Sequence, residues 1–221
     1  MRIDVLNPDA EVLAEAVRVV RRGGVVVYPA DTIYGLGCDP FNPEAVSRLM
    51  ALKGRDEGKG CLVLIPDNHW LDRLASEVPS AGRALCERFW PGPLTVVTRA
   101  LSTLPGGIRS GRGTVGLRRP RNPFLEAWLE LLESPLVSTS ANRSGQPYVG
   151  DPTVLRNLFG PGVDLFLDAG ELPQSLPSTV VDLTTSPFRV LRAGGEADAV
   201  RAELDRLSAE SPESPSEETL M

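Results

Sequence analysis

The stretch VVVYPADTIYGLGCDPFNPEAV, residues 25–46, decides the fold. It opens with an apolar run typical of a buried strand, meets a polar group at Asp31, and continues through the glycine-rich segment YGLG. It closes on Asn42-Pro43-Glu44, a capping signal for a helix that should end near residue 52. The pattern predicts a strand, a glycine-rich turn and then a helix.

The rest of the chain alternates between strands and helices in the same way. An amphipathic helix is predicted at the start, with Asn7 as its N-cap, Pro8 at its first position and Gly23 just beyond its end. Its apolar face is formed by Val12, Leu13, Ala16, Val19 and Val20. We expect the first strand at 24–28 and further strands at 61–65, 94–98, 114–117, 136–138, 163–167, 179–183 and 189–191. Further helices are expected at 80–89, 124–133, 152–159 and 195–207, and Asp151-Pro152 should cap the one at 152–159. The fold class is α/β, with a mixed sheet and flanking helices.

Length and composition indicate one globular domain. The 221 residues are 42% hydrophobic and 24% charged, which is ordinary usage for a folded domain. We expect the domain to occupy residues 1–207 and the tail 208–221, rich in Ser, Pro and Glu, to be disordered. The four glutamates of the tail account for most of the net charge of −6, so the body is nearly neutral. The chain has no run of 18 apolar residues and no secretory signal, which favours a cytoplasmic protein without membrane contact.

The cysteine and histidine content offers little catalytic chemistry. Cys38, Cys61 and Cys86 are odd in number and far apart in the sequence, so they are interpreted as buried free thiols and not as a disulfide or metal framework. His69, the only histidine, lies in DNHWLD, which is interpreted as a surface loop. No metal ligand is predicted.

Three cations gather in LKGRDEGKG, directly before an apolar strand. Lys53 and Arg55 follow a helix, where cations also complement the helix dipole, so that role stays open as the alternative. Lys59 stands between two glycines, which let a backbone approach an anion closely. Because Lys and Arg make charge-assisted bonds to phosphate, the cluster favours a triphosphate ligand.

Other polar groups also stand where strands end. The segment PLVSTSANRSG places Ser138, Ser140 and Asn142 after an apolar run, where they could meet phosphate oxygens or cap a turn. Arg118 follows another strand, and a buried guanidinium needs either an internal carboxylate or an anionic ligand, of which we favour the ligand. Arg192 follows a third strand. Loops at strand ends form the ligand sites of open α/β sheets.

Two further segments are ambiguous or structural. The loop GGIRSGRG, residues 106–113, matches neither the P-loop nor the G-x-G-x-x-G spacing, and a lid and a plain surface loop both stay open. The segment FWPGPLTVV is interpreted as structural: Phe89 and Trp90 pack and the Pro-Gly-Pro sequence turns the chain.

Seven motifs, taken in order, resemble the YrdC-like family of L-threonylcarbamoyladenylate synthases. They are PADTIYGLGCD, LKGRDEGKG, FWPGPLTVV, TVGLRRP, PLVSTSANRSG, STVVDL and VLRAGG, and the resemblance covers about residues 8–195. The length resembles the short, single-domain, TsaC-like branch. The resemblance implies a YrdC-like fold around an electropositive cavity, and synthesis of threonylcarbamoyl-AMP and pyrophosphate from L-threonine, bicarbonate and ATP, with Mg²⁺ carried by the ATP. The product would pass to a tRNA threonylcarbamoyl transferase complex, and direct contact with tRNA stays open.

The resemblance also implies roles for individual residues. Lys53 and Arg55 are predicted to be catalytic. Positions that match L-threonine contacts are Thr32, Arg118 and Ser178, and positions that match ATP contacts are Arg55, Lys59, Thr114, Ser140, Asn142 and Arg192. The sequence departs from the pattern at Ala30, where many members have threonine, and at Leu64, where the longer branch has histidine. Gly150 stands where the family pattern has a hydroxyl residue in contact with the nucleotide, and it is not assigned a role.

Two alternatives belong to other functional classes. One is an RNA-binding module in tRNA or ribosome maturation, which the acidic net charge and the three tyrosines disfavour. The other is an enzyme that forms a carbamoyl-adenylate from carbamoyl phosphate in place of threonine and bicarbonate.

Overall fold

The structure, a computed structural model, describes residues 1–31, 33–173 and 175–210. Thr32 and residues 211–221 lie outside the described residues. The last described helix runs to Glu210, three residues beyond the predicted end of the domain at residue 207. Among the described residues, none of the helices has the length and apolar character needed to cross a bilayer.

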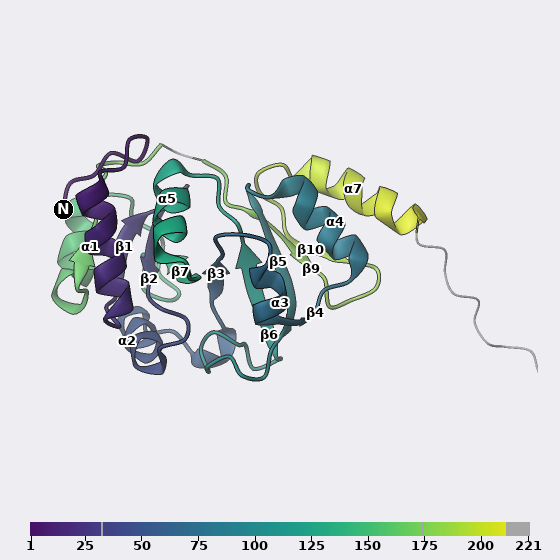
Figure 1. The fold of residues 1–221 in the computed structure, drawn as a ribbon, viewed down its shortest axis with the longest axis horizontal. Coiled ribbons are helices and arrows are strands. Elements are labelled where there is room, and N and C mark those ends of the chain that lie inside the picture. The colour runs from purple at the N-terminus through teal and green to yellow at the C-terminus, as the bar shows by residue number, and fades with distance from the viewer. Residues whose placement is uncertain (32, 174, 211–221) are drawn as a thin grey trace, which may run out of the picture.

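A mixed sheet of ten strands forms the centre of the molecule (Figure 1). Its strand order is β10-β9-β5-β6-β3-β7-β2-β1-β8, with β4 paired to β5. The strands are β1 (Val26–Pro29), β2 (Tyr34–Gly37), β3 (Leu62–Leu64), β4 (Ala75–Glu77), β5 (Leu94–Ala100), β6 (Thr114–Arg118), β7 (Leu136–Ser140), β8 (Leu165–Phe166), β9 (Thr179–Asp182) and β10 (Arg189–Arg192). The predicted α/β class with a mixed sheet is confirmed.

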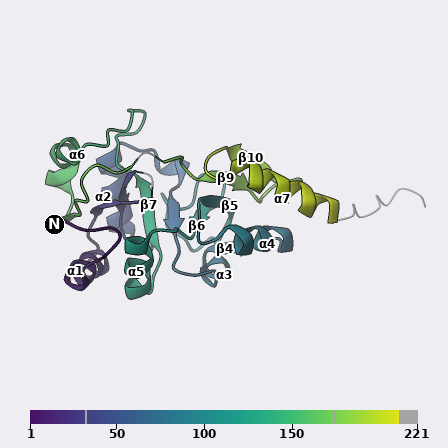
Figure 2. The same cartoon turned by 90° about the horizontal axis from the view of Figure 1, so that it is seen from above.

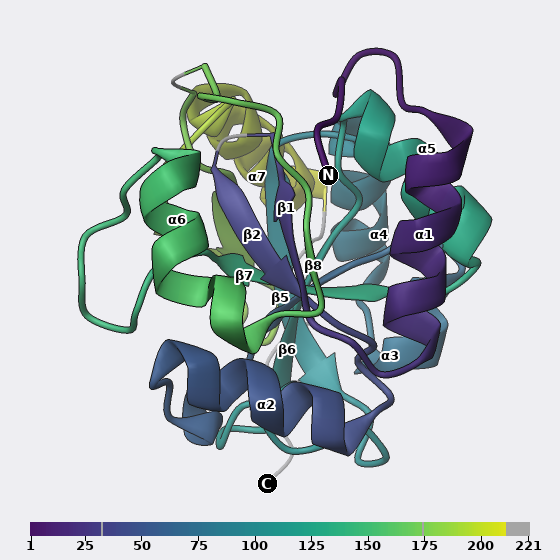
Figure 3. The same ribbon diagram turned by 90° about the vertical axis from the view of Figure 1, so that its left-hand side faces the viewer.

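Helices cover both sides of this sheet. They are α1 (Ala10–Arg21), α2 (Pro43–Lys53), α3 (Trp70–Leu74), α4 (Ser80–Phe89), α5 (Pro123–Leu132), α6 (Pro152–Phe159) and α7 (Ala197–Glu210), with single 3₁₀ turns η1 (Glu57–Lys59) and η2 (Gly160–Gly162). α1 and α5 pack side by side on one face (Figure 2), and α6 lies on the opposite side of β1 and β2 (Figure 3). α4 and α7 pack together beside β5, β9 and β10.

Strand β1 explains why the opening stretch is continuously apolar. Side chains alternate between the two faces of a strand, and here both faces are covered. Val25 and Val27 enter the larger core, which includes α2 and α4, whereas Val26 and Tyr28 enter a second core beneath α1 and α5.

The three cysteines, Cys38, Cys61 and Cys86, are buried and free, so the prediction for them is confirmed.

The glycine-rich segment after β1 is a strand and not the predicted turn. Residues 34–37 form β2, which pairs antiparallel with β1 and also with β7, so this glycine-rich segment is part of the sheet. The glycines admit close packing: a Cβ on Gly37 would lie 2.7 Å from the Val137 carbonyl oxygen and 2.8 Å from Cε1 of Tyr28. The prediction was wrong because these glycines are required by close contacts with neighbouring strands, whereas in the local sequence they resemble turn residues.

Two local predictions also need correction. The N-cap of α1 is Asp9 and not Asn7, because the Asp9 side chain accepts from the backbone N–H groups of Glu11 and Val12. DNHWLD is not wholly a surface loop: His69 is exposed, but the next residue begins α3, which buries Trp70. The caps predicted at Asn42 and Asp151 are confirmed, and so is the packing of Phe89 and Trp90.

Candidate functional site

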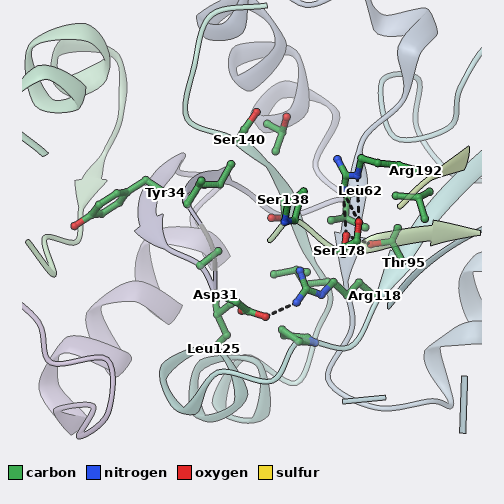
Figure 4. Close-up of a pocket in the computed structure, with 18 of the residues that line it drawn as sticks. Asp31, Tyr34, Leu62, Thr95, Arg118, Leu125, Ser138, Ser140, Ser178 and Arg192 are labelled. Carbon is green, nitrogen blue, oxygen red and sulfur yellow. Dashed lines mark hydrogen bonds and ion pairs between the residues drawn. The ribbon is translucent and has the colours of Figure 1, made fainter. Parts of the chain in front are cut away.

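A cavity of about 310 Å³ lies among the central strands of the sheet (Figure 4). Its walls come from the turn between β1 and β2, from β3, β5, β6 and β7, and from the segment around β9 and β10. Its charged and hydroxyl-bearing lining residues include Asp31, Arg55, Thr95, Arg118, Ser138, Thr139, Ser140, Ser178 and Arg192. The cavity therefore brings together Arg55, Arg118, Ser140, Ser178 and Arg192 from the predicted site.

Arg118 sits at the end of β6 and is bound on two sides. Its Nη2 donates to Oδ2 of Asp31, and its Nε donates to the Gly92 carbonyl oxygen at 3.0 Å. The sequence analysis favoured a ligand over an internal carboxylate, and the structure shows that the carboxylate is present. The reason is burial: the Arg118 side chain is only 10% exposed, and a buried guanidinium needs a counter-charge.

The Asp31–Arg118 pair shows how strongly this wall is shielded from water. Burial lowers the pKa of Arg118, an effect that Asp31 opposes. Burial raises the pKa of Asp31, and here Arg118 opposes the effect. Each charge therefore favours the charged form of the other, against the effect of burial. Arg118 still lines the cavity beside its partner.

Ser178 and Arg192 form a second cluster across the cavity (Figure 4). The Nε and Nη2 of Arg192 donate to the Ser178 carbonyl oxygen at 3.1 and 3.0 Å, and Nη2 also donates to Oγ of Ser178 at 3.1 Å. The same hydroxyl shares a hydrogen bond of 2.8 Å with Oγ1 of Thr95 on β5. Ser178, which matches a threonine contact, is thus hydrogen bonded to Arg192, which matches an ATP contact.

The loop after β10 is locked against the segment before β9. The backbone N–H of Gly195 donates to the Pro177 carbonyl oxygen at 2.8 Å, and Oγ1 of Thr179 donates to the Gly195 carbonyl oxygen at 2.7 Å. A Cβ on Gly194 would lie 2.0 Å from the Pro177 carbonyl oxygen, so only glycine fits. This packing sets the position of Arg192.

Lys53 does not line the cavity. It is the last residue of α2 and is 2% exposed. Its Nζ donates to the carbonyl oxygen of Ser140 and, at 2.9 Å, to that of Asn142, with Oδ1 of Asn142 at 3.3 Å. Burial, together with the neighbouring Arg55, lowers the pKa of Lys53 to about 8. The ammonium group of Lys53 is thus hydrogen bonded to the loop after β7. The catalytic role of Lys53 stays a prediction.

That loop orders the hydroxyl and amide groups after β7. Oγ of Ser140 donates to Oδ1 of Asn142, and Nδ2 of Asn142 donates to the Gln146 carbonyl oxygen at 2.6 Å. The backbone N–H of Ser144 donates back to the Lys53 carbonyl oxygen at 2.8 Å. Ser140 lines the cavity, whereas Asn142 lies outside its lining and stabilises the turn.

The remaining predicted residues lie on a neighbouring pair of loops. The guanidinium of Arg55 donates to the Gly60 carbonyl oxygen, with Nη2 at 2.8 Å. The loop 106–113 is hydrogen bonded to the segment that carries Lys59, because the Gly111 N–H donates to the Gly58 carbonyl oxygen at 2.9 Å. Oγ1 of Thr114 shares a hydrogen bond of 2.7 Å with a hydroxyl of the same loop. Lys59 and Thr114 lie outside the lining of the cavity.

The cavity includes polar residues that the sequence analysis did not assign. Asp31 was noted only as a polar residue after a strand, and Thr95 was hidden in the apolar run of β5. Ser138 was noted, and it accepts from the Tyr28 hydroxyl at 2.6 Å. Thr32 lies outside the described residues. Within the described part of the chain, no group of three or more His, Cys, Asp or Glu side chains could hold a metal ion.

The arginines and hydroxyls that line this cavity are groups that can bind a small anionic molecule. The family model for Sua5, YciO and YrdC proteins, described as "Telomere recombination", matches residues 18–194. The chain belongs to this family.

Three relatives show how far the similarity extends. The threonylcarbamoyl-AMP synthase of Thiobacillus denitrificans is 40% identical over 174 residues, which are 79% of this chain and 91% of that protein. The crystal structure of P. abyssi Sua5 complexed with L-threonine has a TM-score of 0.83 at 33% identity and covers 92% of this chain. This chain spans 61% of that one. The crystal structure of E. coli YciO has a TM-score of 0.79 at 31% identity and covers 88% of this chain and 95% of its own.

Proposed function

We propose that this protein is an L-threonylcarbamoyladenylate synthase. It would form threonylcarbamoyl-AMP and pyrophosphate from L-threonine, bicarbonate and ATP. The observation that carries the proposal is one cavity that joins Arg118 and Ser178, which match threonine contacts, to Arg55, Ser140 and Arg192, which match ATP contacts. The synthase from Thiobacillus denitrificans and the Sua5 structure with L-threonine support it.

The proposed chemistry has two steps. The amine of threonine and bicarbonate combine, with loss of water, to N-carboxythreonine. An oxygen of its new carboxylate then attacks the α-phosphorus of ATP, the bond from this phosphorus to the bridging oxygen breaks, and pyrophosphate leaves. Mg²⁺ enters as part of the MgATP substrate and offsets negative charge on its phosphates.

The arginines meet the electrostatic need of the second step. Two anions must approach each other, and fixed cations in a site shielded from water lower that barrier. Arg55 and Arg192 line the cavity and would face the phosphates, with Lys59 on the adjoining loop. Arg118 would hold the threonine carboxylate, and Ser178, held in place by Thr95, would orient the amino acid. In this scheme Lys53 acts on the substrate only through the loop after β7.

The proposal also places the protein in a sequence of reactions. Threonylcarbamoyl-AMP is a mixed anhydride, and its carbamoyl carbon is activated for transfer to an amine. A tRNA threonylcarbamoyl transferase complex would consume it at an adenosine of tRNA. The synthase would accordingly work in the cytoplasm.

Release of pyrophosphate from ATP tests the proposal. We expect release that needs threonine and bicarbonate together and that falls when either is omitted. Arg55→Ala should lower kcat/KM for ATP, and the decrease should correspond to a loss of about 2–4 kcal/mol in transition-state binding. Arg48→Ala, which removes an exposed arginine bound to Asp164, is the matched control and should leave turnover unchanged.

Two other results would contradict the proposal and indicate a different function. Release that needs carbamoyl phosphate and no threonine would indicate the carbamoyl-adenylate enzyme. No release, with tRNA retained in a salt-dependent way, would indicate the RNA-binding module.

A further inference from the structure

Asp31 carries a buried carboxylate oxygen to which no described residue donates a hydrogen bond. Oδ2 accepts from Arg118, but Oδ1 has no hydrogen-bond partner among the described residues. The side chain is 16% exposed, and it lines the cavity (Figure 4). Buried polar atoms are nearly always hydrogen bonded, so an exception inside a ligand cavity marks a place where a donor can arrive with the ligand.

A second aspartate shows that a half-buried aspartate paired with an arginine need not have a carboxylate oxygen without a hydrogen-bond donor. Asp168 is 17% exposed and is also paired with an arginine, Arg156, at 3.2 Å. Its other oxygen, Oδ1, accepts from the Gly170 N–H at 3.0 Å. Asp168 does not line the cavity. The two aspartates thus have similar exposed fractions and the same type of partner, but only Asp31 has an oxygen without a donor among the described residues.

Arg118 likewise has a nitrogen without an acceptor among the described residues. Its Nε is bound to the Gly92 carbonyl oxygen and its Nη2 to Asp31, which leaves Nη1 without a hydrogen bond to the described residues. A guanidinium nitrogen and a carboxylate oxygen, each without a partner among the described residues, therefore belong to one ion pair in the cavity wall. An α-amino acid presents the opposite pair, because its ammonium and carboxylate groups are attached to the same carbon.

We propose that Oδ1 of Asp31 accepts a hydrogen bond from the α-amino group of the amino-acid substrate while Arg118 binds the carboxylate. Asp31 is then a specificity-determining residue that selects α-amino acids over acids without the amine. After carboxylation the nitrogen keeps one N–H, which can donate to the same oxygen. The inference rests on the proposed function, since it assigns the amino-acid end of that site.

Direct binding measurements on Asp31→Asn test this inference without relying on turnover. Calorimetry would compare L-threonine with 3-hydroxybutanoate of matching configuration, in which a hydrogen replaces the amine. For threonine, the variant should lose about ten- to a hundredfold in affinity, because a charge-assisted hydrogen bond is lost. For the hydroxy acid, affinity should rise, because the repulsion between its carboxylate and that of Asp31 is removed. Asp168→Asn is the control matched in burial and should change neither value.

The opposite directions of these two changes separate recognition from a structural role. If Asp31 only stabilised Arg118, both ligands would lose affinity together, and that result would overturn the inference. Unchanged discrimination in a variant whose thermal unfolding matches the wild type would overturn it as well. Failure of the proposed function would look different: the wild type would bind another α-amino acid in place of threonine, still through Asp31.

Discussion

Thr95 tests the amino-acid side of the cavity at the scale of one hydroxyl. Its Oγ1 bonds to Oγ of Ser178, and valine keeps its shape while removing that bond. Thr95→Val should raise KM for threonine about three- to tenfold, as expected for one hydrogen bond, and should leave KM for ATP unchanged. Thr98→Val is the control, because Thr98 is buried on the same strand and bonds to the Glu77 carbonyl oxygen. Equal effects of the two variants would contradict the assignment.

Lys53 predicts a pH dependence of stability. Its folded-state pKa of about 8 lies below the ordinary 10.5, so between these values unfolding takes up a proton and the free energy of unfolding rises with pH. Lys53→Met should be less stable at pH 7 by about 2 kcal/mol, because buried carbonyl oxygens lose their donor. The deficit should grow by about 1 kcal/mol per pH unit above pH 8.

Chemical denaturation at pH 7.5 and 9.5 would measure both effects of the Lys53 substitution. Lys59→Met, at an exposed position on the next loop, should show neither of them. A deficit for Lys53→Met that stays constant across this pH range would show that the ammonium group is not held in a buried environment.

Sequence alone predicted which residue types meet at the cavity but not how they pair. Arg118 and Asp31 are 87 positions apart, and nothing in their local patterns connects them. The Lys53 contacts were hidden for the same reason: its acceptors are carbonyl oxygens of a distant loop, and every residue has a carbonyl. Pairing of this kind depends on the tertiary fold.

At the scale of elements, Gly37 on β2 is the sharpest test of the β1–β2 hairpin. A Cβ there would meet the Val137 carbonyl oxygen at 2.7 Å, and backbone of a central strand cannot move aside. Gly37→Ala should therefore lower the free energy of unfolding by at least about 2 kcal/mol in urea denaturation. Gly116→Ala, on β6, is the control because its nearest neighbours would lie 3.7 Å away. A stable Gly37→Ala protein would contradict the close packing of β2 and β7.

Helices were easier to predict than strands because their signals are local. Asn42-Pro43 and Asp151-Pro152 begin α2 and α6, as the capping pattern predicted. The pattern failed at Asn7, where a second capping residue, Asp9, follows two positions later. The turn predicted over the glycines of β2 was also wrong, because these glycines make room for the Tyr28 ring on the neighbouring strand. Where packing selects a residue, the local sequence is misleading.

At the scale of the whole molecule, Glu203 attaches α7 to the rest of the domain. Its side chain is 3% exposed and bonds to Arg88 of α4 at 2.5 Å and to Arg206 at 2.6 Å. The hydrogen bond from Arg206 lowers the pKa of Glu203, so its contribution to stability is present above the ordinary value of 4.5 and is lost as pH falls.

Substitution of Glu203 tests this attachment. Glu203→Gln should lower the melting temperature at pH 7, and the difference from the wild type should shrink as the pH is lowered below 4. Asp198→Asn is the control, because Asp198 is fully exposed on the same helix, where it pairs with Arg201. A difference for Glu203→Gln that is the same at both pH values would contradict the role of the charge.

Isotope tracing would show whether threonine, bicarbonate and ATP are joined in one cavity. The purified protein would be incubated with MgATP, ¹³C-bicarbonate and ¹⁵N-threonine, and the nucleotide products analysed by mass spectrometry. We expect an AMP conjugate that carries both labels, with one pyrophosphate released for each conjugate formed. A conjugate of AMP and threonine without ¹³C, or pyrophosphate without any conjugate, would contradict it.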